Sequence, residues 1–555
     1  MLKSSPIFRH SCFHPPFSAF SCVPLIGLEI HAQLTSSRSK VFSPVQYAFA
    51  APPNTQVHHF DAALPGSLPI LNRNCFEWAI VAGLGLNCRI NLISKFDRKH
   101  YFYADSPAGY QITQHDLPVA EDGWLEYIWK APELKSIPQV SKAKIRRIQL
   151  EQDTGKSLHD EKSSRSLIDL NRAGVALIEI VTDPVFTMSC QAAAFVDELA
   201  SLLRHLRVCS SNMSTGEMRV DINVSVGSSL SQQGPVVEIK NVNSLRAIRH
   251  AIDYEIHRQR KIYRSGGKVI NETRSFDVLS NKTISMRDKE VLQDYRFLPE
   301  PNLPLIRLLE FCKNCSQTEY SQLKTICIGC IRERHKTDLA NLPIILRKEL
   351  VFQHNLSPER AGCLIDHPTL LSLYISTSKF ALNQSESIKN TIFTVQNIKK
   401  EDFPHLIYRE LAFWCTGQLY SCLRDKPEFC LPSDELLSQF VIMNLTGDIF
   451  GTGSEQVLSE MCEARESPNV LEIAERLGVL LNHDLYTIKS ACSGFIENNS
   501  TLVKKYVRKG RKHRTLLSMV RRIVLDHKDP RRLHEGLVER YLSDMLANID
   551  VDDKQ

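Results

Sequence analysis

The chain has 555 residues, of which 43% are hydrophobic and 23% charged, and its formal net charge is +6. That length predicts about three domains, and the composition is typical of a folded globular protein rather than a disordered one. No apolar run approaches the ~18 residues that a membrane-spanning helix needs, so we expect no membrane contact, while the mild positive charge permits a polyanionic partner without requiring one.

The N-terminal segment, residues 1–23, is rich in serine, contains Lys3 and Arg9, and has no acidic residue. A secretory signal would need a clean apolar region, which is absent, whereas a basic, acid-free composition is typical of an organelle transit peptide. A disordered tail remains an alternative, because Pro15 and Pro16 interrupt any amphipathic helix. We predict a mitochondrial transit peptide here and a matrix location.

Residues 24 to about 300 contain both strand-like and helix-like patterns. Short runs such as 218–224 alternate polar and apolar residues, the period of a strand with one polar face. Residues 191–206 and 245–263 repeat apolar side chains at helical spacing. Strands and helices that are segregated in this way predict an α+β fold with a largely antiparallel sheet.

The expected strands carry polar residues two apart, so each pair shares one face. The first pair is Glu29 and His31. The others are Glu151 with Asp153, Asp169 with Asn171, Arg219 with Asp221 and Asn223, and Glu238 with Lys240. Any single pair is consistent with a solvated face of an antiparallel sheet. Their repetition between strongly apolar neighbours favours one lined cavity.

Carboxylates combined with an imidazole suit Mg²⁺, whose coordination is usually completed by substrate phosphates and water. Basic side chains in the same segments offer charges for phosphate, namely Arg172, Arg219, Lys240 and Arg287. The combination fits phosphoryl transfer, in which positioning and charge neutralisation provide most of the catalysis.

The segment Asp153-Thr-Gly-Lys156-Ser157 resembles the end of a phosphate-binding P-loop. Leu150 stands where the first glycine of that motif must be, and without this glycine the backbone cannot wrap the phosphates. We therefore reject a P-loop. Lys156 remains a candidate phosphate contact.

Most of the 16 cysteines stand singly in apolar stretches, which indicates buried, reduced thiols. Four form two closely spaced CxxC pairs: Cys312, Cys315, Cys327 and Cys330. Four thiolates at this spacing predict a structural, tetrahedral zinc site. A redox dithiol is the alternative.

After Pro343 the sequence is helical, with no convincing strand. Near the C-terminus seven Lys or Arg residues are concentrated: Lys504, Lys505, Arg508, Lys509, Arg511, Lys512 and Arg514. A solvated helix face is the common explanation for such a cluster, but its density favours contact with a polyanion. Tyr506 is a candidate for stacking on a base.

Read in order, segments between residues 26 and 304 closely resemble the B subunits of aspartyl/glutamyl-tRNA amidotransferases. The matching segments are IGLEIHAQL, FDAALPGSLPILN, SKFDRKHYFYADSPAGYQITQHDLP, LEQDTGKSLHD, SLIDLNRAGVALIEIV, GEMRVDINVSV, EIKNVNS, NETRSFD, SMRDKE and DYRFLPEPNLP. They are collinear, which excludes coincidence. The C-terminal half is more diverged but has the helical texture of the same family.

This resemblance implies a carbon–nitrogen ligase with glutamine as amido donor. The family's B chain uses ATP and Mg²⁺ to phosphorylate the side-chain carboxylate of glutamate mischarged on tRNA(Gln). Ammonia from the glutaminase, or A, chain then gives Gln-tRNA(Gln), and a small C chain completes the heterotrimer. The implied fold is an antiparallel-sheet cradle, then an all-α domain, then a small α-helical tail domain that helps to hold the tRNA.

The resemblance also orders the candidate residues. Glu29 and His31 match the family's GLEIH strand, and Glu151 and Asp153 match its acidic segment, so these four are the expected catalytic residues. Mg²⁺ is expected on Glu29, His31 and Glu151. The expected cofactor-binding residues are Lys156, Arg172, Arg219, Asp221, Asn223 and Lys240.

Two departures from the family pattern stand out. Gln152 replaces an acid in the segment that precedes Gly155, so one common carboxylate is missing. Many relatives also carry a cysteine zinc site between the GLEIH strand and the LPG turn, and those positions here are Ser43, Val45, His58 and Asp61. We expect that site to lack metal, and the tetrad at 312–330 to be independent of it.

The predicted organisation is a transit peptide at 1–23, a cradle domain at 24–310, a Cys₄ insert at 311–332, a helical domain at 333–479 and a tRNA-binding tail at 480–555. Two other functions remain open. The chain could be a non-catalytic tRNA-binding scaffold of the same complex, with Gln152 a sign of a decayed site, or a zinc-ribbon nucleic-acid binder. The last leaves the polar strand faces unexplained.

Overall fold

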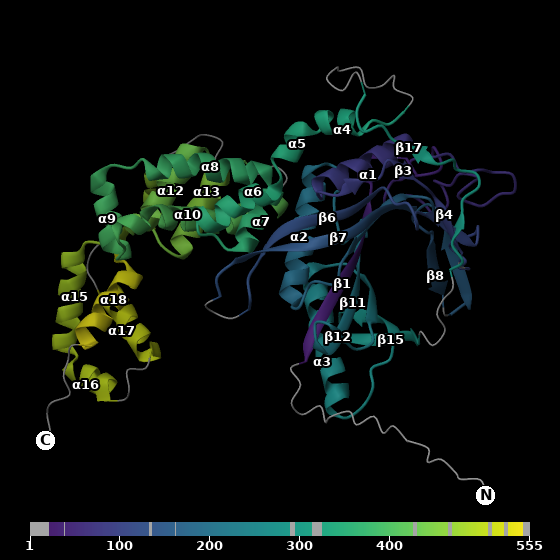
Figure 1. The fold of residues 1–555 in the computed structure, drawn as a ribbon. Coiled ribbons are helices and arrows are strands. Elements are labelled where there is room, and N and C mark those ends of the chain that lie inside the picture. Colours follow the sequence, from purple (N-terminus) through teal and green to yellow (C-terminus); the bar gives the residue numbers. More distant parts are fainter. Residues whose placement is uncertain are drawn as a thin grey trace, which may run out of the picture. The chain divides into compact units, whose positions relative to one another are not determined.

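The computed structural model describes residues 22–37, 39–100, 102–132, 136–160, 162–288, 295–312, 325–425, 430–463, 469–508, 513–526 and 531–547. The chain forms two compact units, Met1–Lys348 and Glu349–Gln555, which are described separately (Figure 1). Nearly all of the predicted transit peptide falls outside the described residues. Among the helices that are described, none combines the length and the apolar character that a membrane crossing requires.

A ten-stranded sheet forms the centre of the first unit. Its main path runs β15 (Lys282–Asp288), β14 (Glu272–Asp277), β13 (Val237–Val242), β11 (Met218–Ser229), β1 (Val23–Gln33), β10 (Ala176–Thr182), β7 (Gln139–Gln152), β6 (Ala120–Trp129) and β2 (Arg89–Ile90), with β12 (Gln232–Gln233) beside β11. Neighbouring strands are antiparallel except for β13 and β14, which are parallel. The first strand of the chain thus lies near the middle of the sheet.

Smaller sheets flank the large one. They are β16 (Leu298–Pro299) with β4 (Asp97–His100) and β5 (Tyr110–Thr113), then β17 (Ile306–Arg307) with β3 (Ile93–Ser94), and the hairpin of β8 (Lys156–Asp160) and β9 (Arg165–Asp169). Strand β5 contacts β7, so the three-stranded sheet borders the polar face of the large sheet.

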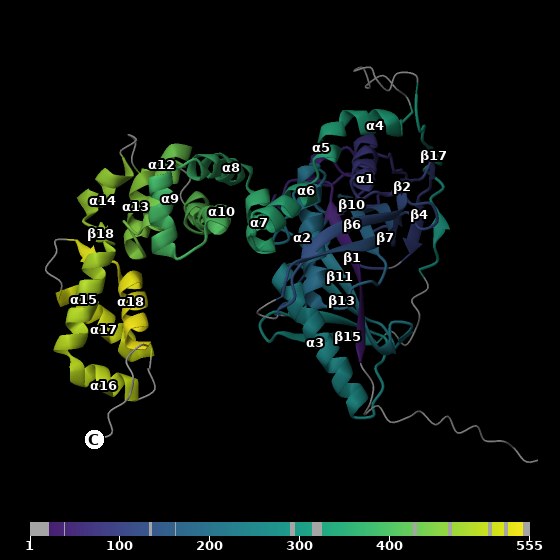
Figure 2. The same cartoon turned by 60° about the vertical axis from the view of Figure 1, so that its left-hand side comes forward.

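Helices pack on the other face of the large sheet (Figures 1 and 2). The long ones are α1 (Arg73–Gly85), α2 (Ser189–His205) and α3 (Leu245–Arg264), and shorter ones follow as α4 (Ile328–Arg334), α5 (Lys336–Ala340) and α6 (Pro343–Lys348). Ile26, Leu28 and Ile30 of β1 share one buried core with these helices. Because side chains alternate along a strand, Glu29 and His31 lie on the opposite face.

The second unit is almost entirely helical. Its helices are α7 (Pro358–Asp366), α8 (Pro368–Leu382), α9 (Glu386–Gln396), α10 (Phe403–Trp414), α11 (Tyr420–Asp425), α12 (Asp434–Thr446), α13 (Thr452–Glu463), α14 (Val470–Leu477), α15 (Leu485–Asn498), α16 (Ser500–Arg508), α17 (His513–Asp526) and α18 (Glu535–Ala547). Helices α15 to α18 share a core of their own with Val395 of α9.

The predicted α+β class is confirmed, and both predicted long helices agree with α2 and α3 within two residues at either end. The expectation of no strand after Pro343 was wrong, because β18 (Leu481–Asn482) pairs in parallel with β19 (Arg532–Leu533). Only two residues of each strand pair, which is too short for a periodic signal. The domain limits at 310, 332 and 479 stay predictions; helices α4 to α6 belong to the first compact unit.

His534 connects this small parallel pair to α18. Its backbone N–H donates to Asn482 O at 3.0 Å, and its ring nitrogen Nδ1 accepts from Leu537 N at 3.2 Å at the start of α18. The side chain is buried, and burial lowers the pKa of His534 to about 4. The neutral ring therefore acts as a cap for α18.

A pKa that is lower in the folded state gives stability that is complete above the unfolded value of 6.5 and is lost as the pH falls toward 4. The loss amounts to about 2–3 kcal/mol. We expect amide hydrogen exchange in α18 of the full chain, corrected for intrinsic rates, to accelerate between pH 6.5 and 4.5. His534→Asn keeps a capping acceptor but does not titrate, so it should remove this acceleration. Equal acceleration in the variant would contradict the assignment.

Candidate active site

Four neighbouring strands place one row of polar side chains side by side on the open face of the large sheet. His31 on β1 pairs with Arg219 on β11 and with Glu179 on β10, and Glu179 pairs in turn with Gln149 on β7. Ile30, Ile178 and Val220, which alternate with these residues, are buried in the core and fix the orientation of the row.

His31 and Glu179 at the centre of this row lie close to Glu151, which follows Gln149 on the same face of β7, and these three side chains could hold a metal ion. His31 Nδ1 lies 3.1 Å from Glu151 Oε1, and one ligand atom of each residue lies within 4.8 Å of the others. Glu151 also accepts from Thr113 Oγ1 at 3.2 Å, and Gln149 donates to Glu179 and to Thr113. Two carboxylates and an imidazole at this spacing are suited to a divalent cation.

The pKa values report a local excess of negative charge. Burial alone would lower the pKa of His31, but the hydrogen bond to Glu151 and the charges of Glu179, Glu151 and Asp221 raise it to about 9. Burial and the charge of Glu151 raise the pKa of Glu179 to about 7. Burial acts against ionisation of Glu151 as well, yet the hydrogen bond and charge of His31 hold its pKa below the ordinary value. The group therefore favours bound positive charge.

Glu29 lies one row away from this group. It pairs with Asp221 on β11, and its carboxylate accepts from Asn223 Nδ2 at 3.0 Å. Asp221 in turn lies 3.5 Å from Lys240 Nζ, which also pairs with Glu238 at 3.1 Å. The predicted cofactor-binding residues of β11 and β13 thus form a second polar cluster beside the first.

Asp153 joins two predicted phosphate-binding arginines. Its Oδ2 lies 3.0 Å from Arg219 Nη2 and 3.4 Å from Arg172 Nε. Arg172 also donates to the backbone oxygens of Thr154 and Gly155. Arg219 Nε is buried and has no hydrogen-bond partner among the described residues. Arg219 therefore has a donor that the described residues leave unused, whereas Arg172 mainly fixes the loop after β7.

The turn at Gly155 explains why the segment 153–157 resembles the end of a P-loop. Gly155 N donates to Asp105 O, and a Cβ on Gly155 would meet Asp169 O at 2.9 Å. The chain then enters strand β8 at Lys156, whereas a P-loop leads into a helix. The rejection of a P-loop is confirmed. Lys156 is exposed on this hairpin and makes no part of the His31 group.

Gln152 does not face the three ligands. It alternates with Glu151 at the end of β7 and so follows the orientation of Ile148 and Leu150, which point into the core. Its backbone oxygen accepts from Gln111 at 2.7 Å. The carboxylate that is missing here is therefore not one of the ligands around His31.

Sequence reasoning missed Glu179, the third member of the group. The residue stands between Ile178 and Ile180 in a strand with buried neighbours on both sides. A single acid in such a run was the available signal, because a buried carboxylate needs a charged or hydrogen-bonding partner. Thr113 and Gln149, which orient Glu151 and Glu179, gave no comparable signal.

The other predicted sites are on elements that do not belong to the large sheet. Cys312, Cys327 and Cys330 come together beside α4, while Cys315 lies outside the described residues. In the basic segment, Lys504, Lys505 and Arg514 are exposed; nothing is described of the Arg508 side chain or of Lys509, Arg511 and Lys512. Tyr506 is buried in the core of α15 to α18, so the expectation that it stacks on a base was wrong.

Comparison with known proteins places this geometry in a family. The GatB/GatE catalytic domain matches residues 24–312. The B chain of the mitochondrial glutamyl-tRNA(Gln) amidotransferase of Danio rerio is 39% identical over 490 residues, which is 87% of this chain and 82% of the relative. That of Aedes aegypti is 39% identical over 88% of this chain and 87% of the relative, and that of Homo sapiens 48% identical over 64% and 62%.

The chain belongs to the amidotransferase B-subunit family. The matched region contains every strand of the large sheet, including β1, β7, β10 and β11. The His31 group therefore lies within the part of the chain that defines the family.

Asp61, one of the four positions where the family resemblance led us to expect an absent zinc site, belongs to a buried ion pair. Lys40 Nζ lies 2.8 Å from Asp61 Oδ2, and both side chains are almost completely buried. Asp61 also accepts from Ser43 Oγ and from the backbone N–H of His58. The ammonium group thus cross-links the loop that precedes α1.

Removing one partner of a buried ion pair leaves the other charge uncompensated, which costs about 3–5 kcal/mol. We expect Lys40→Met to lower the free energy of unfolding of the full chain by this amount. Urea unfolding followed by tryptophan fluorescence measures it, because Trp78, Trp124 and Trp129 lie in the first unit. Lys336→Met removes an exposed pair with Glu333 and should cost less than about 1 kcal/mol. Equal losses in the two variants would contradict a buried role for Lys40.

Proposed function

We propose that this chain is the activating component of a glutamyl-tRNA(Gln) amidotransferase of the mitochondrial matrix. In this role it uses ATP to phosphorylate the side-chain carboxylate of glutamate carried by tRNA(Gln). The observation that carries the proposal is the buried group of His31, Glu151 and Glu179, which lies within the family's catalytic region. Relatives that cover most of the chain bear the mitochondrial amidotransferase name.

The residues of the polar face fit Mg²⁺. His31, Glu151 and Glu179 would hold it, and Glu29 lies in the adjacent row. With two oxygen donors and one nitrogen supplied by the chain, the ion would take its other ligands from water and phosphate oxygens. When bound, the ion neutralises charge on the phosphates of ATP and on the transferred phosphoryl group. A bound cation would lower the raised pKa values of His31 and Glu179, because it would offset the negative charge around them.

The chain's other residues orient the reactants. The Arg219 side chain is partly exposed, and its guanidinium would donate to a phosphate oxygen. Asp153 holds the Arg219 guanidinium, and Asn223 holds the Glu29 carboxylate. Lys240 adds a positive charge from β13. The face can therefore bind and align a polyphosphate beside a carboxylate substrate.

The reaction has two steps, phosphorylation of the carboxylate and its amidation. An oxygen of the glutamate carboxylate bonds to the γ-phosphorus as the bond to the ADP oxygen breaks, which gives a γ-glutamyl phosphate and ADP. Ammonia then attacks the acyl carbon, phosphate leaves with the electron pair of the broken C–O bond, and nitrogen loses a proton to give the amide. The complete enzyme is in this view a carbon–nitrogen ligase with glutamine as amido donor.

The proposal requires partners. Ammonia comes from the glutaminase, or A, chain of the complex, and the small C chain completes the heterotrimer. The exposed basic residues Lys504, Lys505 and Arg514 of α16 and α17 support tRNA contact by the tail, and Arg521 and Arg522 add to the exposed positive charge of α17. Residues 1–23 would direct import and be removed.

The alternative function is a tRNA-holding scaffold without catalysis. Gln152 was the sequence feature that favoured it. Because Gln152 alternates with Glu151 in β7, its lack of charge leaves the His31 group intact. The complete ligand group supports the catalytic proposal over the scaffold.

His31→Ala removes a ligand from the centre of the group. In the reconstituted heterotrimer with Glu-tRNA(Gln), we expect ATP-dependent phosphorylation and amidation to fall by about 100-fold or more. Binding of the tRNA should remain nearly unchanged, because the basic tail is untouched. Product Gln-tRNA(Gln), ADP release and tRNA affinity are the three quantities to measure.

His250→Ala is a matched control, since His250 is half-buried on α3 and bonds only to Asn281 in the described structure. It should retain full activity. Undiminished amidation in His31→Ala would defeat the site assignment, and absence of ATP turnover in the wild-type complex would favour the scaffold.

Replacing Lys504 and Lys505 together with alanine should weaken tRNA binding about 3–10-fold near physiological salt. The slope of log affinity against log salt concentration should fall by about 1–2, because each lost contact to phosphate releases fewer counterions. The paired change of Lys399 and Lys400, two exposed neighbours elsewhere in the same unit, controls for net charge. Equal effects of both double variants would overturn a specific role for α16.

A further inference from the structure

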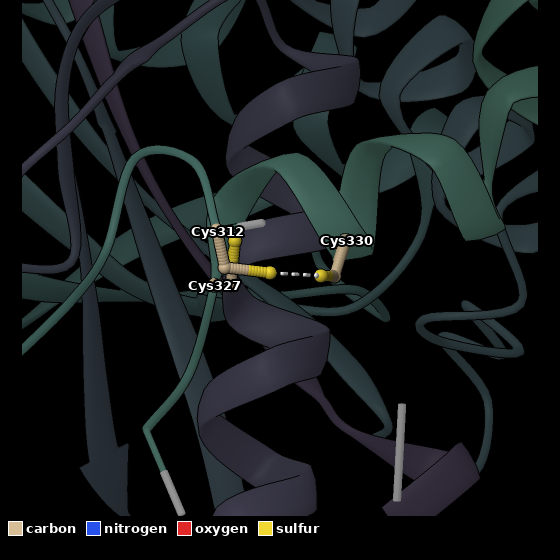
Figure 3. Close-up of side chains that lie close together, drawn as sticks. All are labelled: Cys312, Cys327 and Cys330. Atoms are coloured by element: carbon tan, nitrogen blue, oxygen red, sulfur yellow. Dashed lines mark hydrogen bonds between the residues drawn. The ribbon is translucent and has the colours of Figure 1, made fainter. Parts of the chain in front are cut away.

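Three cysteine side chains converge beside α4, far along the chain from the His31 group. Figure 3 shows Cys312, Cys327 and Cys330 directed toward one another, from the segment before α4 and from α4 itself. Their sulfur atoms lie within 4.8 Å of one another, with 3.3 Å between Cys312 Sγ and Cys330 Sγ. Cys327 and Cys330 are buried.

The sulfur spacing is that of a metal site. A disulfide would bring two sulfur atoms to about 2.05 Å. Four thiolates around one zinc at about 2.3 Å have S···S separations of roughly 3.8 Å. The Cys312–Cys330 separation of 3.3 Å is somewhat shorter than that value, and all three sulfur atoms lie within 4.8 Å of one another. Isolated buried thiols pack as small apolar groups, so convergence of three of them in one place needs a further reason.

The backbone around the cysteines is already arranged as a tight knuckle. Leu309 N donates to Ile326 O at 3.0 Å, Ile328 N donates to Leu309 O, and Gly329 N donates to Glu310 O, both at 2.9 Å. Cys327 Sγ lies 3.9 Å from Glu310 O in the same knuckle. These bonds hold the chain before Cys312 against the chain that carries Cys327.

We propose that Cys312, Cys327 and Cys330 bind a structural Zn²⁺ ion. Thiolates are soft ligands, and a set of them favours zinc over the hard cations that suit the His31 group. The CxxC spacing of the sequence makes Cys315 the fourth thiolate; that residue lies outside the described part of the chain, and the sequence alone supports its part. A closed shell of four thiolates leaves no position for a substrate.

The site fixes the last segment of the cradle to its first helix. Ile328 and Ile331 of α4 belong to the core of the large sheet, and Arg334 pairs with Glu77 of α1 at 3.1 Å. A zinc ion between Cys312 and α4 would hold this helix against the segment that follows β17. Binding of the metal would therefore stabilise α4 without touching the polar face of the sheet.

Metal analysis of the purified full chain tests the proposal. We expect one zinc per chain in the wild type, less than about a fifth of that in Cys327→Ser and Cys330→Ser, and full occupancy in Cys363→Ser, a half-buried cysteine of the second unit. Cys315→Ser should weaken zinc binding at least tenfold in a competition with a chelator. Unchanged affinity in that variant would overturn the four-thiolate form of the site.

A second measurement does not depend on the folding of variants. The wild-type chain, with its metal exchanged for Co²⁺, should show the intense sulfur-to-cobalt absorption of a tetrahedral thiolate site. Chelation should accelerate amide hydrogen exchange in α4 while exchange in β1 stays unchanged. Wild-type protein without stoichiometric metal, or with Cys312 and Cys330 recovered as a disulfide after alkylation under native conditions, would overturn the proposal.

Discussion

The arrangement of the cradle depends on one electrostatic constraint, the close approach of buried carboxylates around a single imidazole. Glu151 and Glu179 both lie within 4.8 Å of a ring nitrogen of His31, and the nearest basic side chain on the same row, Arg219, is already shared with Asp153. Negative charge at low solvent exposure is costly unless a cation offsets it. The raised pKa values of His31 and Glu179 express this cost, and a divalent ion would relieve it.

Much of this site follows from strand periodicity alone. The spacing of Glu29 with His31, and of Arg219 with Asp221 and Asn223, correctly placed each set on one face, because side chains alternate whatever the surroundings. The spacing does not give the register between strands that are distant in sequence. For that reason Glu179, which the register sets opposite His31, was missed, and the neutral Gln152 was given an importance that its orientation does not support. The two-residue strands β18 and β19 were too short to show a period.

Two different cross-links hold the edges of the first unit. A lysine ammonium connects Lys40 to Asp61 in the loop before α1, where the family resemblance led us to expect a vacated zinc site. Three cysteines converge beside α4, the helix that packs against α1. The ion pair holds the loop that leads into α1, and the zinc site that we propose would hold α4, the helix packed against α1. The two would thus stabilise α1 from separate places.

The central position of β1 has a consequence for how the protein is made. Its partners β10 and β11 lie about 150 and 190 residues further along the chain, so the strand is synthesised long before either neighbour exists. Contacts of such sequence separation form slowly, and an apolar strand edge left unpaired is prone to associate with other chains. His31 is thus translated early but meets Glu179 only after β10 has been made, and until then the unpaired edges of β1 are open to association with other chains.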